Sequence, residues 1–111
     1  MLRNTIFLLI TMCSTLMSSL SFAHYPILTC SVQQANENKV VICEASFSNR
    51  AKAPNVIMEV FSDEDEVLAS GTTDDQAMYQ FPLPESDYFI LMDAGPGHVL
   101  EISNDEVSNN L

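Results

Sequence analysis

Two histidines, His24 and His98, are the residues of this 111-residue chain whose side chains are best suited to binding a metal ion. Imidazole nitrogens bind nickel, cobalt, copper and zinc alike. Asp93 and Glu101 lie close to His98 in the sequence, and each could add a carboxylate oxygen. The chain therefore offers the donor atoms of a divalent transition-metal site, for which we expect the ligands His24, His98 and Asp93.

The segment Asp93–His98 has the sequence Asp-Ala-Gly-Pro-Gly-His and is predicted to fix the positions of two of these side chains, those of Asp93 and His98. Gly95 and Gly97 permit backbone angles that other residues avoid, and Pro96 stiffens the turn between two apolar strands. We expect this corner to hold Asp93 and His98 together at one end of a sheet. Aspartate in such a turn commonly caps its own backbone amides, and we favour that role even with a metal nearby. Glu101 should alternate to the face opposite His98, as a solvated charge.

The first 23 residues have the pattern of a secretory signal peptide. Arg3 gives a positive start, residues 6–12 are apolar, and residues 21–23 form a cleavage site. Cleavage after Ala23 would leave a mature domain over residues 24–111 that begins with His24. Its free α-amine and imidazole could then chelate one metal ion. Pro26 excludes the other amino-terminal nickel and copper arrangement, because that mode needs a backbone N–H that proline lacks.

Export and charge limit the partners of the chain. The apolar run of the signal is too short to span a membrane, and no second apolar segment follows, so we expect no stable membrane anchor. The weaker alternative is a lipoprotein acylated at Cys13. Fifteen acidic residues and a net charge of −11 exclude nucleic acid and favour cations or a basic partner. Solubility alone is the blander explanation of this charge.

The mature chain is predicted to form a single β-sandwich of about seven short antiparallel strands, with a polar tail that frays from residue 104. Residues 27–34 and 39–47 alternate as a hairpin, and pairing Gln34 with Lys39 sets Cys30 opposite Cys43. Directly opposed cysteines can form a disulfide, which an oxidising compartment permits. Residues 87–93 form an apolar run that suits a central strand buried on both faces.

Two resemblances follow from these motifs. From Pro54 onward the sequence resembles carboxypeptidase regulatory-like domains of transthyretin-like fold, in residues 56–62, 71–84 and 87–91; that family usually has glycine at or beside Ala77. The corner, followed by Glu101, is similar to that of small exported components of energy-coupling-factor nickel and cobalt transporters. Those proteins also tend to begin their mature chain with histidine. The resemblance implies nickel or cobalt as the metal and a membrane transporter as partner. It departs at Val99, where the family often has a basic residue, and in the membrane helix with which many members end.

Other functions are supported less well. The chain shows no nucleophile–base pair and no phosphate-binding loop, so we expect no enzyme. The methionines of the strands suit core filling better than a copper(I) site, and the acidic run at residues 63–66 lacks the spacing of a calcium loop. Our first hypothesis is an exported metal-binding sandwich that assists nickel or cobalt uptake. The alternatives are a structural or protein-interaction module without metal, and a periplasmic copper-binding protein.

Overall fold

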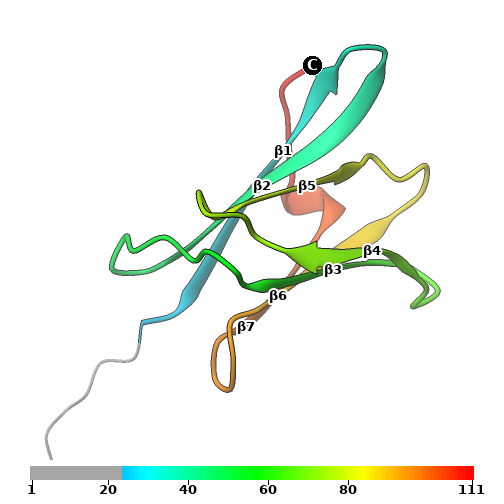
Figure 1. Ribbon diagram of the computed structural model, residues 1–111. Coiled ribbons are helices and arrows are strands. Elements are labelled where there is room, and N and C mark those ends of the chain that lie inside the picture. The colour runs from blue at the N-terminus through cyan, green and yellow to red at the C-terminus, as the bar shows by residue number, and fades with distance from the viewer. Residues whose placement is uncertain (1–23) are drawn as a thin grey trace, which may run out of the picture.

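The computed structural model describes residues 24–111, so the signal peptide predicted for residues 1–23, its cleavage site and Cys13 lie outside the described residues. These residues form eight strands and one short 3-10 turn (Figure 1). Between His24 and Leu111 there is no helix of the length and apolar character needed to cross a membrane. The fold is therefore all-β, as predicted, with one strand more than expected.

The strands form two four-stranded sheets that pack as a sandwich. Sheet A has the order β5 (Met78–Pro82), β2 (Asn38–Phe47), β1 (Pro26–Ala35) and β8 (Ser108–Asn109). Sheet B has the order β4 (Val67–Thr72), β3 (Ile57–Ser62), β6 (Tyr88–Asp93) and β7 (Val99–Ser103). Neighbouring strands are antiparallel except β1 and β8, which run parallel. In Figure 1 the long β1–β2 hairpin extends past sheet B, and the C-terminus lies beside its tip.

The β1–β2 hairpin has the predicted register. Gln34 pairs with Lys39, and Cys30 lies opposite Cys43, to which it is joined by a disulfide. Both cysteines are buried, with 2% and 0% of their surface exposed. The two-residue turn begins with Asn36, whose positive φ of 58° suits asparagine better than most residues. The alternating pattern and the cysteine pairing thus identified one register, and that prediction is confirmed.

The core lies between the facing sides of the two sheets, where alternate residues of each strand point inward. The buried apolar side chains are Cys30, Val32, Val41, Cys43, Ala45, Ala53, Met58, Val60, Phe81, Tyr88, Ile90, Met92 and Ile102. Met58 and Met92 lie opposite each other on β3 and β6 and are completely buried. They fill the core, as the sequence predicted.

Strand β6 differs from its prediction. It is a central strand, but only Tyr88, Ile90 and Met92 are buried, whereas Phe89 and Leu91 are half-buried on the outer face. The run was expected to be buried on both faces because it is continuously apolar. In the described part of the chain, sheet B has a second layer on one side only, so its outer face stays partly open to solvent.

The segment after residue 103 also differs from the frayed tail that was expected. Residues Asn104–Glu106 form a 3-10 turn, and the backbone N–H of Ser103 donates to Glu106 Oε2 at 2.8 Å. β8 then pairs with β1 at Ser31 and Val32. Composition alone suggested fraying, but β1 has a free edge, and even a polar strand can satisfy its backbone groups there.

Candidate metal site

The corner between β6 and β7 is a well-defined turn. The N–H of His98 donates to the carbonyl of Gly95 at 2.9 Å, and the N–H of Ala94 donates to the carbonyl of His98 at 2.9 Å. Gly97 has φ 78°, the value needed at the third position of a type II turn, and Pro96 occupies the second position, where proline is favoured. Gly95 also has a positive φ, of 105°. The predicted special shape of this corner is therefore present.

Asp93 lies at the end of β6 and caps the corner. Its Oδ1 accepts a hydrogen bond of 3.0 Å from the backbone N–H of Gly95. This is the capping role that the sequence favoured for it. The carboxylate is half-buried, and its Oδ2 is the oxygen that this bond leaves for another partner.

His98 has one ring nitrogen engaged within the same corner. Its Nδ1 lies 3.1 Å from the carbonyl oxygen of Pro96. Because a carbonyl can only accept, Nδ1 carries the proton, and the lone pair of the neutral ring is then on Nε2. The ring also stands edge-on to Phe47, with centroids 6.0 Å apart and planes at 90°. Two contacts from different parts of the chain thus restrict the ring.

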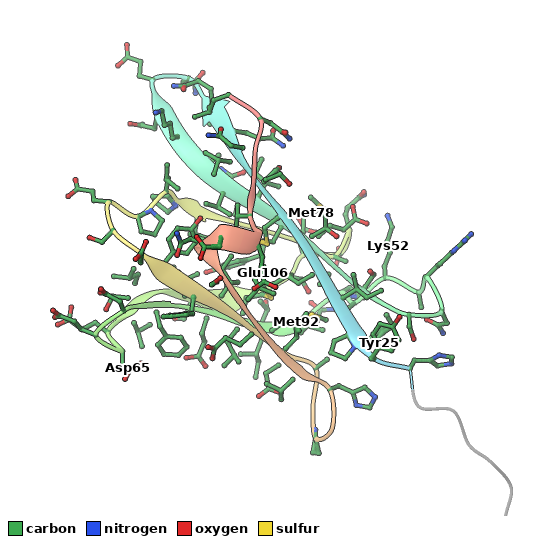
Figure 2. All side chains as sticks on the ribbon, turned by 180° about the vertical axis from the view of Figure 1, so that it is seen from behind. Tyr25, Lys52, Asp65, Met78, Met92 and Glu106 are labelled. Atoms are coloured by element: carbon green, nitrogen blue, oxygen red, sulfur yellow. A yellow bond between two sulfur atoms is a disulfide. The ribbon has the colours of Figure 1, made fainter. Side chains whose placement is uncertain are left out.

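His24 lies at the same end of the sandwich. It comes just before Tyr25, whose carbonyl accepts from the N–H of Ser48 at 2.9 Å and whose own N–H donates to Ser48 Oγ at 3.2 Å. Ser48 follows Phe47, which pairs with Pro26 and contacts His98. Phe47 therefore connects the start of β1 to the corner. Figure 2 shows Tyr25 at this end of the molecule, where the described chain begins.

The structure does not bring the three expected ligands into one coordination sphere. Asp93 and His98 share the corner, while the side chain of His24 is exposed. Within residues 24–111 no three His, Cys, Asp or Glu side chains form a group that could hold a metal ion. A metal at this end would therefore need His24 to move toward the corner.

Glu101 does not belong to the corner. It lies on β7 opposite Leu91 and is exposed, whereas Leu100 and Ile102 on either side turn toward the core. This agrees with the prediction of a solvated charge. The sequence reasoning missed Phe47, which contacts His98 from the end of β2. No sequence signal pointed to it, because residues 47 and 98 meet only through the packing of two sheets.

A second site was also missed, at the opposite end of the sandwich. A groove of about 520 Å³ lies between the β3–β4 turn, β4 and the connection from β5 to β6. The available signal was two acidic segments, around residues 63–66 and 85–87, which nothing in the sequence brings together. No protein family, curated protein or solved structure matches this chain, so its own geometry carries the functional argument.

Proposed function

We propose that this protein is exported and binds a divalent transition metal, nickel or cobalt, through His24, His98 and Asp93, and that it assists uptake of the metal by a membrane transporter. The observation that carries the proposal is the contact between His98 Nδ1 and the carbonyl oxygen of Pro96. Histidines that bind metals usually donate their other ring N–H to a carbonyl or carboxylate, which fixes the ring and raises the basicity of the free nitrogen. The corner provides this arrangement for Nε2.

The remaining donors fit the same class of metal. Asp93 keeps one carboxylate oxygen beyond its bond to Gly95. His24, as the first residue of a processed chain, would add an α-amine and an imidazole. Nitrogen donors with one carboxylate suit nickel, cobalt, copper and zinc, and exclude the all-oxygen shells of calcium and magnesium. The resemblance of the corner to exported nickel and cobalt uptake components favours the first two metals and a transporter partner.

Two observations support export. The pattern of residues 1–23 is that of a cleavable signal peptide. The Cys30–Cys43 disulfide is compatible with an oxidising compartment such as the periplasm or the outside of the cell.

The test is calorimetric titration of the chain processed to begin at His24, with nickel, cobalt, copper and zinc in turn. We expect one ion per chain, bound more weakly as the pH falls, because the donors must be deprotonated. Inserting an alanine before His24 should weaken binding on the order of tenfold or more without changing the free energy of unfolding. His98→Ala should weaken the same site.

Matched variants separate ligation from folding. Asp93→Asn keeps an oxygen that can accept from the Gly95 N–H but removes the charge, so it should weaken binding while the corner survives. Glu101→Gln removes an exposed charge on the outer face and should change nothing. If the inserted alanine and His98→Ala both leave nickel and cobalt affinity unchanged, the proposed site does not exist. Tight copper binding with negligible nickel or cobalt binding would support the copper alternative instead.

The transport step needs its own readout. Cells that export the chain should accumulate more labelled nickel or cobalt from a limiting medium than cells that export His98→Ala at the same level. Equal accumulation by cells with and without the exported protein would remove the uptake role, even if the metal site itself is present.

A further inference from the structure

The groove opposite the histidines combines apolar and acidic walls. Leu68 and Leu83 supply apolar surface, and Phe81 continues it into the core. Its carboxylates come from both sides: three from the β3–β4 turn and two from the segment that precedes β6. They are Asp63, Glu64, Glu66, Glu85 and Asp87, and all five are exposed. The lining, drawn from residues 62–87, contains no basic side chain.

The acidic turn on one side of this groove is held in shape. Ser62 Oγ accepts from the backbone N–H groups of Glu64 and Glu66 at 3.2 and 3.1 Å, and the N–H of Ser62 donates to the carbonyl of Glu66 at 2.8 Å. Asp65, at the tip, takes a positive φ of 63°. Figure 2 shows Asp65 at the end of the molecule away from Tyr25. The three carboxylates that this turn contributes to the groove are therefore presented on a fixed turn.

Strand β4 borders the groove and is an edge of sheet B. It pairs with β3 alone, and Leu68 and Ala69 of this strand also line the groove. All of its residues except Ala69 are exposed. Charged side chains and proline are two common means by which proteins protect an edge strand. The sequence of β4, Val-Leu-Ala-Ser-Gly-Thr, contains neither. A bulge, another such device, occurs at the β3–β4 register shift near Val67, and the ring of Tyr79 lies close to Gly71 at the other end of the strand.

We propose that β4 and the acidic groove bind an extended, lysine- or arginine-rich segment of another protein by strand addition. The backbone groups along the free edge of β4 suit a partner in extended conformation, because a strand can pair with them in register and replace the water that otherwise bonds to them. Alternate side chains of that strand would face the groove, where apolar residues meet Leu68 and Leu83 and basic residues meet the carboxylates. A second copy of this chain is disfavoured, because its net charge of −11 would face the same acidic walls. The proposal does not depend on metal binding.

The probe is a fluorescent peptide in which pairs of lysines alternate with pairs of valines, long enough to pair with all six residues of β4. Either face of the extended peptide then carries both basic and apolar side chains. Fluorescence anisotropy should show saturable binding that weakens with added salt. The same peptide with glutamate in place of lysine should not bind. Glu64→Gln with Glu85→Gln should weaken binding about two- to thirtyfold, the range expected for two exposed ion pairs. Asp75→Asn with Asp105→Asn removes the same charge away from the groove and should have a smaller effect.

Strand addition itself has a separate readout. Bound peptide should slow amide hydrogen exchange in β4 and leave β7, the other edge of sheet B, unchanged. Two lysine peptides should differ, one N-methylated at the odd-numbered residues and the other at the even-numbered residues. One of them should lose binding and the other should retain it, because a strand forms backbone hydrogen bonds with one edge only at alternate residues. Equal binding of the two methylated peptides, equal protection of β4 and β7, or equal effects of the two double variants would overturn the proposal. So would a stable dimer of the parent chain that protects β4 without peptide.

Discussion

The ring of His98 stands edge-on to the ring of Phe47, with the centroids 6.0 Å apart and the planes perpendicular. The contact joins the last residue of β2 in sheet A to the corner of sheet B. Edge-to-face aromatic pairs contribute about 0.5–1.5 kcal/mol beyond the burial of their surface. Because both side chains are partly exposed, the lower part of that range applies here.

A double-mutant cycle on this pair is the first prediction. Phe47→Leu keeps most of the apolar volume and His98→Ala removes the ring, so their combined effect on the free energy of unfolding should fall short of the sum by about 0.5 kcal/mol. Urea denaturation of the four proteins measures it. The control pairs His98→Ala with Phe61→Leu, because Phe61 lies opposite Phe89 at the far end of β3. Coupling equal to that of the control would show that the contact has no energetic role.

The corner glycines give a second prediction. An added Cβ would meet no atom within 4 Å at Gly95 or Gly97, so a larger residue is strained by the backbone alone. Replacing either by valine should lower the free energy of unfolding by roughly 1 kcal/mol or more. Asparagine tolerates the φ of 78° at Gly97 better, so Gly97→Asn should cost less than Gly97→Val. Thermal melting that is the same for all of these variants would contradict the positive φ values.

The disulfide gives a third prediction. Cys30 and Cys43 are buried, so thiol reagents should find no free cysteine in a chain of residues 24–111, and reductant should act only when the protein is partly unfolded. Replacing both cysteines by alanine should lower the free energy of unfolding by about 3 kcal/mol, the scale expected for a loop this short. Stoichiometric labelling of both cysteines under denaturing, non-reducing conditions would be the contrary result.

Much of the fold could be predicted because local pattern and pairing agree. Gln34 opposite Lys39 sets the inward face of β1 and β2 as well as the disulfide, so one register explains two features. The corner was predictable for a similar reason, since glycine and proline restrict the backbone locally. Ala77 has φ 63°, which explains why glycine would suit that turn.

What could not be predicted depends on contacts between distant segments. The pairing of β8 with β1 follows from the free edge of β1, and the polar sequence of residues 104–111 does not predict it. Phe47 meets His98 only because the two sheets close at that end. The acidic groove likewise requires two turns, separated in sequence, to line the same groove with β4.

Thr73, the one polar side chain found in the core of residues 24–111, gives a fourth prediction. Its hydroxyl donates to the carbonyl of Ala53 at 2.7 Å and accepts from the N–H of Val56 at 2.9 Å. Thr73→Val keeps the shape but leaves both backbone groups without this partner, which should cost about 1–3 kcal/mol of stability. Thr73→Ser keeps the hydroxyl and should cost less. Urea denaturation that ranks serine below valine would show that the hydroxyl bonds are not the cause.

Burial of two tyrosines gives the last prediction. Desolvation raises the pKa of Tyr79 and of Tyr88 above the ordinary value of 10.0. The ring of Tyr88 is edge-on to the ring of Phe81, with the centroids 5.9 Å apart. The ring of Tyr79 lies close to Gly71, so close that a Cβ added to this glycine would be 2.9 Å from it. In the folded protein both hydroxyls therefore stay neutral at a pH where those of the unfolded chain have begun to ionise.

The sign of the effect follows from proton binding. Below about pH 10 both states hold these protons, so the tyrosines add no pH dependence. Above it the folded state holds more protons than the unfolded state, and the free energy of unfolding should fall until the pH passes the raised pKa values. Urea denaturation from pH 8 to 11 measures the slope, and Tyr79→Phe or Tyr88→Phe should reduce it. Tyr25→Phe is the matched control, because that ring is 64% exposed. An alkaline slope unchanged in both core variants would mean that other groups cause it.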